Sequence, residues 1–148
     1  MAELPIEVFG HNLETVRRLY PTARREADYE RSLGVLDTAR QVSSSGTMIK
    51  SGIMVGLGET REELVELFRD LASVHVDILT IGQYLRPERR NLEVVRYYRP
   101  EEFGPLEELA MSAGIRAVKA GPYVRSSYLA EESYTKAVSY THLRAHET

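Results

Sequence analysis

A short apolar segment followed at once by a glycine turn and an amphipathic helix constrains the fold most. Residues 47–56 (TMIKSGIMVG) are largely apolar and contain Ile and Val, which is typical of a buried parallel strand. Thr60 and Glu63 have the spacing of a capping box, so a helix is predicted to begin directly after the turn. One apolar stripe runs along this helix: Leu64, Leu67, Phe68 and Leu71.

Further strands and a helix are predicted after this unit. Residues 77–84 (DILTIGQY) indicate a second buried strand and residues 115–119 a last one. Between them a helix is predicted to begin at Pro100, or at Pro105 because Gly104-Pro105 interrupts it, and to end at Gly114.

The N-terminal part is predicted to add a strand stub at residues 6–9 and two helices. Asn12 is a candidate cap for a helix over residues 13–20, which Pro21 would end. Asp28 is a candidate cap for a second helix, which would reach about Val42. Alternating strands and helices predict a parallel sheet with right-handed crossovers. Half of a (β/α) barrel and a small open α/β sheet both fit this pattern.

Composition excludes several classes. The net charge of −3 gives no indication of nucleic-acid binding, and no apolar run is long enough to span a membrane. The first five residues lack the basic region of a signal peptide, so a cytoplasmic location is expected. The chain has no cysteine, which excludes disulfides and thiolate metal sites within it.

Three segments at predicted strand ends carry candidate ligand contacts. The glycine turn Gly52-x-Met54-x-Gly56-x-Gly58-Glu59 lets a ligand approach the backbone, and is equally typical of a plain β–α turn. Asn12 and Glu14 are candidate ligand contacts, but they could also be a helix cap and a residue of the first helical turn. By themselves the two residues favour the helix cap over ligand contacts. Gln83-Tyr84-Leu85 could border a planar base, although a polar strand terminus explains these residues better on their own.

Two further segments have weaker local signals. An arginine cluster could receive an acidic protein partner, but composition favours a solvated loop: Arg86, Arg89, Arg90, Arg96 and Arg99. Arg125-Ser126-Ser127-Tyr128 follows the last predicted strand, and no spacing rule makes it catalytic.

Taken together, five segments resemble lipoyl synthases, in the same order: HNLETVRRLYP, ADYERSL, KSGIMVGLGET, DILTIGQYLRP and GPYVRSSY. The resemblance runs from about Val8 to Ala130. It implies the C-terminal half of a partial (β/α)6 radical S-adenosylmethionine (SAM) barrel. Such enzymes insert sulfur at C6 and C8 of an octanoyl chain on a lysine of a lipoyl carrier protein or lipoyl domain. One [4Fe–4S] cluster cleaves SAM to a 5′-deoxyadenosyl radical, and a second cluster supplies the sulfur.

The resemblance also implies roles for particular residues. Asn12 and Glu14 would lie near the ribose and methionine of SAM, and Gln83, Tyr84 and Leu85 near its adenine. The strand-five SAM motif would comprise Gly52, Met54, Gly56 and Glu59. Ser126 would be a metal ligand of the auxiliary cluster, and the adjacent Arg125 would help to control that ligand in catalysis.

Departures from the family limit this expectation. The two cysteine triplets of the family are absent, so the chain is expected to hold no cluster stably and to be an inactive fragment. Leu129 replaces the histidine that usually follows RSSY, and Gly10 replaces the usual asparagine. The alternative is a non-catalytic half-barrel that binds SAM or a carrier protein. A different radical SAM enzyme, such as biotin synthase, is a third interpretation, disfavoured by RSSY.

The expected domain organisation is one barrel part over residues 1–130, with the RSSY segment, and a tail over 131–148. Residues 138–148 (VSYTHLRAHET) do not resemble the family. They look like read-through of a sequencing adapter, with a divergent natural tail as the alternative.

Overall fold

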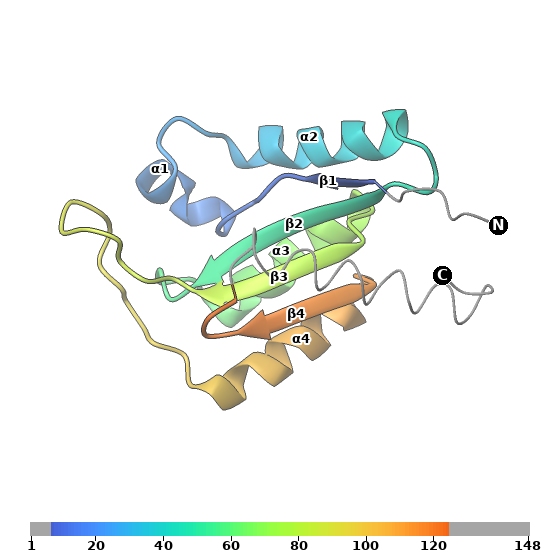
Figure 1. Ribbon diagram of the computed structural model, residues 1–148. Coiled ribbons are helices and arrows are strands. Elements are labelled where there is room, and N and C mark those ends of the chain that lie inside the picture. The colour runs from blue at the N-terminus through green and yellow to red at the C-terminus, as the bar shows by residue number, and fades with distance from the viewer. Residues whose placement is uncertain (1–6, 125–148) are drawn as a thin grey trace.

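The fold is an α/β arrangement around a parallel sheet, seen in a computed structural model that describes residues 7–124 (Figure 1). The sheet consists of β1 (Val8–Gly10), β2 (Met48–Val55), β3 (Ile78–Gln83) and β4 (Ala117–Gly121). Its strands lie in the order β1-β2-β3-β4, and every neighbouring pair is parallel. The predicted parallel sheet is therefore confirmed.

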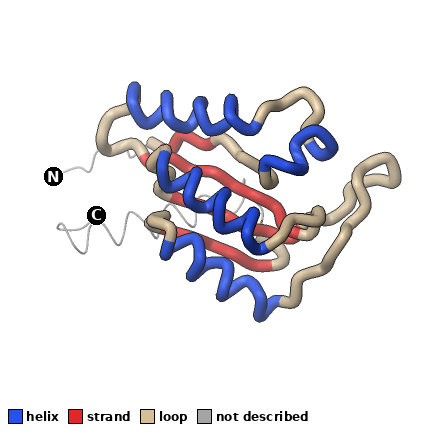
Figure 2. The backbone as a smooth tube through the Cα atoms, turned by 180° about the vertical axis from the view of Figure 1, so that it is seen from behind, coloured by secondary structure: helices blue, strands red, loops and turns tan. Residues whose placement is uncertain are grey.

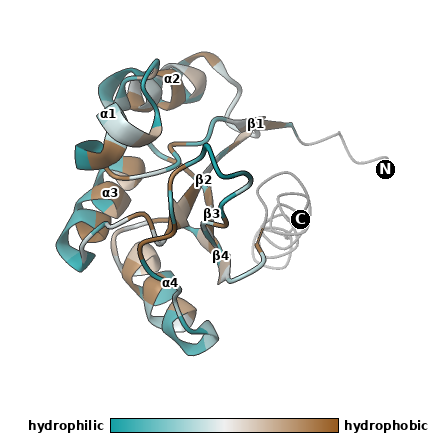
Figure 3. Cartoon of the chain, turned by 90° about the vertical axis from the view of Figure 1, so that its left-hand side faces the viewer, coloured by the Kyte–Doolittle hydropathy of each residue, from teal (hydrophilic) through white to brown (hydrophobic). Residues whose placement is uncertain are grey.

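The helices cover one face of this sheet, as Figures 2 and 3 show from two further sides. They are α1 (Tyr20–Ala23), α2 (Tyr29–Val42), α3 (Arg61–Ser73) and α4 (Phe103–Ser112), with 3₁₀ turns at Arg17–Leu19 and Pro100–Glu102. Helices on one face of consecutive parallel strands are what part of a barrel wall has, so the architecture is consistent with part of a radical SAM barrel. In the described part of the chain, no helix is long and apolar enough to cross a membrane.

Two of the predicted helix starts are confirmed in atomic detail. The Asp28 carboxylate accepts a hydrogen bond of 3.0 Å from the Glu30 N–H at the start of α2. At the start of α3, the Thr60 hydroxyl accepts from the Glu63 N–H at 3.1 Å, and the Glu63 carboxylate accepts from the Thr60 N–H at 2.9 Å. This reciprocal pair satisfies two backbone donors that the helix itself leaves open.

The helix predicted over residues 13–20 is wrong in its first half, while a 3₁₀ turn over Arg17–Leu19 leads into α1 at Tyr20. Residues 13–16 are not helical, because the Leu13 N–H donates to the buried Ser51 hydroxyl at 3.0 Å and Glu14 forms a bridge with Ile53 of β2. Asn12 therefore caps no helix. Pro21 lies in the first turn of α1 instead of ending a helix, since its fixed φ and missing N–H suit that position.

The start of the last helix also differs from expectation. A 3₁₀ turn begins at Pro100 and passes directly into α4 at Phe103, so Gly104-Pro105 lies in the first α-helical turn and does not interrupt the helix. Proline costs no hydrogen bond in a first turn. Gly114 follows the helix end with φ +117°, which confirms the predicted stop.

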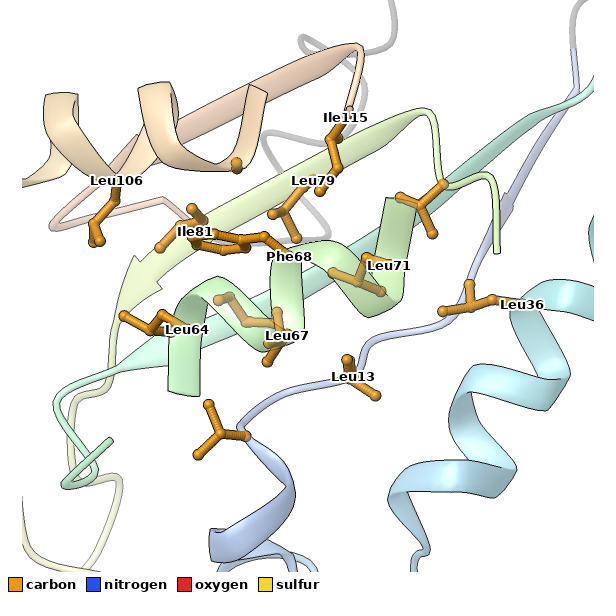
Figure 4. Packing of buried hydrophobic residues seen from close by; sticks show 14 of the residues in the cluster. Leu13, Leu36, Leu64, Leu67, Phe68, Leu71, Leu79, Ile81, Leu106 and Ile115 are labelled. Carbon is orange, nitrogen blue, oxygen red and sulfur yellow. The ribbon is translucent and has the colours of Figure 1, made fainter. Parts of the chain in front are cut away.

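The core lies between the sheet and the helices (Figure 4). The four stripe residues predicted for α3 are all buried, and Phe68 is 0% exposed. They pack with strand residues such as Ile49, Leu79 and Ile81, and with Leu13 from the extended segment. Each such side chain contributes about 1.5–3 kcal/mol when fully buried, so this interface stabilises the arrangement of strand ends described below.

The opposite face of the sheet carries a different set of side chains. Side chains alternate along a strand, so the residues between the core positions of β2 and β3 point away from the helices. Met48 and Ile78 form a small apolar cluster near the beginning of the strands. Gly52 pairs with Thr80, and Met54 with Gly82, near the carboxyl ends. Gly52 and Thr80 are small and line the cleft described below.

Candidate functional site

A cleft of about 520 Å³ opens at the carboxyl ends of the strands. Six of the nine predicted SAM contacts line it: Asn12, Glu14, Gly52, Met54, Gln83 and Leu85. The sheet thus brings together segments from three separate parts of the chain. Carboxyl ends of parallel strands are where barrels and open α/β sheets bind ligands.

A second cavity of about 230 Å³ adjoins the cleft. Glu14, Met54 and Pro87 line both spaces, so the two compartments are neighbours. Tyr84, a seventh predicted contact, lies in the wall of the smaller one, with its hydroxyl donating to the Leu92 carbonyl at 2.7 Å.

Glu14 stands at the boundary between the compartments and has an unusual backbone. Its φ is +73°, and it forms an isolated parallel bridge with Ile53 beyond the end of β1. Its N–H donates to the Gly52 carbonyl at 2.9 Å, and its carbonyl accepts from the Met54 N–H at 2.8 Å. A left-handed non-glycine residue held in this way is strained locally and fixed by its neighbours.

The surroundings of Glu14 also affect its ionisation. Burial raises the pKa of its carboxyl above the ordinary value, and the nearby Arg24 guanidinium partly opposes this shift. A partly buried carboxylate that accepts hydrogen bonds from a ligand would regain part of its lost solvation.

Hydrogen bonds that the sequence did not predict fix the glycine turn. The Glu59 carboxylate accepts from the Gly56 N–H at 2.8 Å, from the Leu57 N–H at 3.0 Å and from the Tyr98 hydroxyl at 2.9 Å. Burial, together with Glu59, places the pKa of Tyr98 far above its usual range, so the phenol remains a donor. Neither Gly56 nor Glu59 lines either cavity, and both instead fix the turn that forms the wall.

Gln83 likewise uses its amide within the protein. Its Nε2 donates to the carbonyls of Arg96, at 2.9 Å, and Tyr84, at 3.0 Å, while its Oε1 accepts from the Tyr98 N–H at 2.9 Å. The side chain therefore fastens the segment after β3 to the strand end. It contributes a surface to the cleft rather than an open amide.

The structure adds residues that sequence patterns did not select. Thr15 and Arg24 line the smaller cavity, and Thr80 lines the larger one. Among the described residues, the Thr15 hydroxyl and the His11 Nε2 are buried without a hydrogen-bond partner. Burial and Arg24 lower the pKa of His11, which favours its neutral form. Thr15 belongs to the polar HNLET segment, but only the tertiary fold shows that it lines the smaller cavity while Asn12 lines the larger one.

The chain returns across the sheet after β4 and closes one side of the cleft. A Cβ atom added at Gly82 would lie 2.4 Å from the Val124 carbonyl oxygen, so only glycine allows this approach. Pro122, Tyr123 and Val124 are accordingly part of the wall. The predicted catalytic residue Arg125 and the predicted metal ligand Ser126 lie outside the described residues.

Within residues 7–124, no three His, Asp or Glu side chains come together as a metal site. The chain contains no cysteine, so it offers no thiolate to an iron–sulfur cluster.

No family model matches the chain, but several known proteins are similar to it. It is 51% identical over 139 residues to the lipoyl synthase of Geobacillus kaustophilus, covering 94% of this chain and 46% of that enzyme. The lipoyl synthase of Koribacter versatilis is 53% identical over 126 residues, covering 85% and 41%. That of Caldicellulosiruptor saccharolyticus is 51% identical over 127 residues, covering 86% and 44%.

The chain spans a little under half the length of these relatives, 46% of the first, while they cover most of it. The predicted resemblance is confirmed at this level. The segments on which it was based include those that line the cleft at the strand ends. The chain is thus similar to lipoyl synthases over most of its length and corresponds to the C-terminal part of these enzymes.

Proposed function

We propose that this chain forms the SAM-binding C-terminal part of a lipoyl synthase, which inserts two sulfur atoms at C6 and C8 of a protein-bound octanoyl chain. About 50% identity to such enzymes supports the family. The observation that carries the binding role is the pair of adjoining compartments at the strand ends, joined at Glu14 and Met54.

The smaller compartment suits the adenine of SAM. Its walls include the apolar side chains of Leu57 and Leu92 and the ring of Tyr84. Thr15 and Asn91 add polar groups, and the buried Thr15 hydroxyl lacks a partner among the described residues. A planar base with polar edges would bury apolar surface and offer that hydroxyl a hydrogen bond.

Glu14 and Asn12 would hold the sugar. A carboxylate can accept from two neighbouring hydroxyls at once, and Glu14 lies where the compartments meet. The methionine part and the octanoyl chain would then occupy the larger compartment, whose wall includes Ile53, Met54 and Val124. In the parent family, bound SAM supplies the radical that removes hydrogen from the octanoyl chain. The residues here orient it and exclude water.

The iron–sulfur clusters would be held elsewhere in a complete enzyme. The chain has no cysteine, so the thiolate ligands of the clusters would come from another part of the enzyme. The role of Ser126 at an auxiliary cluster stays a prediction from the resemblance, as does the inactivity of the isolated chain.

Calorimetric titration of the purified chain with SAM and with S-adenosylhomocysteine tests the binding role. We expect both to bind, and Glu14→Ala to weaken binding by at least about tenfold, since a charged hydrogen-bond partner is lost. Glu62→Ala is the matched control, because Glu62 is an exposed carboxylate on α3 away from both compartments. Absence of binding to the unaltered chain would contradict the proposal.

The catalytic part of the proposal requires a longer protein. Residues 8–130 can replace the corresponding part of the Geobacillus kaustophilus enzyme, and the chimera can be tested for rescue of a lipoate-requiring strain. Rescue is expected. Failure of a well-expressed chimera that still binds SAM would count against lipoyl synthase activity and leave the binding role standing.

The second candidate is a non-catalytic half-barrel that binds SAM or a carrier protein. The absence of cysteine favours it for the chain as written. Continuous coding sequence upstream of Met1 with both cysteine triplets would remove this candidate.

A further inference from the structure

A positively charged loop lies beside the cleft. Residues 85–99, between β3 and the turn that leads into α4, contain five arginines and two glutamates, a formal charge of +3 in a chain whose net charge is −3. In Figure 1 the loop extends beyond the arrowheads of β2 and β3, where the strands end. The positive charge is therefore concentrated in this loop, next to the cleft.

Hydrogen bonds hold this loop to the site. The Val95 N–H donates to the Gly56 carbonyl at 2.8 Å, and the Gln83 amide binds the backbone of Arg96 and Tyr98. Within the loop, the Arg86 Nε donates to the Asn91 carbonyl at 2.9 Å. A partner bound to this loop would thus have a fixed position relative to the cleft.

The loop is continuous with both compartments. Leu85, Arg86 and Pro87 line the larger one, and Asn91 and Leu92 line the smaller one. A protein that contacts the exposed residues of the loop would have the larger compartment directly beside it.

The loop exposes both apolar and cationic side chains. Val95 is 67% exposed, Tyr97 68% and Leu85 47%. The Arg90 side chain is 82% exposed and pairs only with the exposed Glu88, while Arg89 is exposed and has no ion pair among the described residues. Exposed aromatic and aliphatic groups beside arginines are the composition of protein-binding surfaces.

We propose that the 85–99 loop is the docking surface for an acidic protein domain that carries the octanoyl group on a lysine and delivers it into the larger compartment. This inference rests on the proposed function for the nature of the cargo. Charge complementarity selects an acidic partner. The exposed Leu85 and Val95 favour a protein over a nucleic acid, whose backbone offers apolar side chains little to bind.

The test uses the complete chain with an octanoylated lipoyl domain of acidic net charge. Dissociation constants are measured for the chain, for Arg89→Glu/Arg90→Glu, and for the control Arg25→Glu/Arg69→Glu. The control makes the same charge change at exposed arginines that line neither compartment. S-adenosylhomocysteine is titrated into the same samples.

We expect the loop variant to weaken domain binding by about tenfold or more, with steep salt dependence in the unaltered chain, and the control to change it little. Binding of S-adenosylhomocysteine should be equal in all three proteins. If the domain does not bind, or if both variants weaken it equally, the docking proposal is overturned. A DNA duplex that binds in place of the domain and is lost in the loop variant would also overturn it.

The two proposals fail in different ways. Loss of S-adenosylhomocysteine binding in the unaltered chain counts against the proposed function, whereas loss of domain binding alone counts against the docking surface. Arg89 and Arg90 line neither compartment, so the loop variant leaves the ligand contacts intact.

Discussion

Replacement of Gly56 by alanine is expected to destabilise the protein strongly, because this glycine lies against the amide that fastens the loop. A Cβ atom at this position would lie 2.3 Å from the Gln83 Nε2 and 2.5 Å from the Arg96 carbonyl oxygen. Neither atom can yield easily, since they are hydrogen-bonded to each other at 2.9 Å.

The magnitude has two parts. Gly56 has φ +104°, and alanine in a left-handed conformation costs about 1–2 kcal/mol. Displacing Gln83 would disrupt its three hydrogen bonds, to Arg96, Tyr84 and Tyr98, at about 1 kcal/mol each. We therefore expect a loss of about 4–5 kcal/mol in the free energy of unfolding.

Gly58→Ala separates the two parts. Gly58 has φ +108°, but its Cβ would meet only the Val95 methyls, the nearer at 3.7 Å, which is ordinary contact. The backbone cost is thus shared and the clash is not. Urea unfolding followed by circular dichroism should place Gly56→Ala about 2–4 kcal/mol below Gly58→Ala. Equal losses would refute the argument that the Gln83 contacts fix the loop.

Three further outcomes are expected. Burial raises the pKa of Glu14 above its ordinary value of 4.5, so the folded state binds this proton more tightly than the unfolded state does. The free energy of unfolding should therefore fall as pH rises from about 4.5 through the raised pKa. Glu14→Gln should remove that fall in urea midpoints measured against pH, and an unchanged profile would exclude Glu14 as its source. Thr60→Ala should cost about 1 kcal/mol by loss of the α3 cap, with Thr60→Ser retaining most of it, both measured by chemical denaturation. Phe68→Ala should cost about 3–5 kcal/mol through the cavity left in the core, and a loss below 1 kcal/mol by thermal unfolding would contradict its packing.

Local chemistry explains which elements could be predicted. The capping box of α3, the Asp28 cap of α2 and the apolar strand at residues 47–56 depend on neighbours within a few positions, so their patterns are complete in the sequence. The helix predicted over residues 13–20 was wrong in its first half, residues 13–16. Its hydrogen-bond partners, Ser51 and Gly52, lie almost forty positions away, and no local pattern reports them.

The site divides in the same way. The sequence determined that polar and glycine residues stand at the ends of predicted strands, because strand ends and turns have residue signatures, and the resemblance of the same segments identified the family. Only the tertiary structure decided that Glu14 lies between two compartments. It also decided that the side chains of Glu59 and Gln83 form hydrogen bonds within the protein. It also decided that Thr15 and Arg24 join the wall. The physical reason is that a side chain's hydrogen-bonding capacity is fixed by its type, whereas its partners are fixed by which distant backbone groups the packed sheet brings within 3 Å.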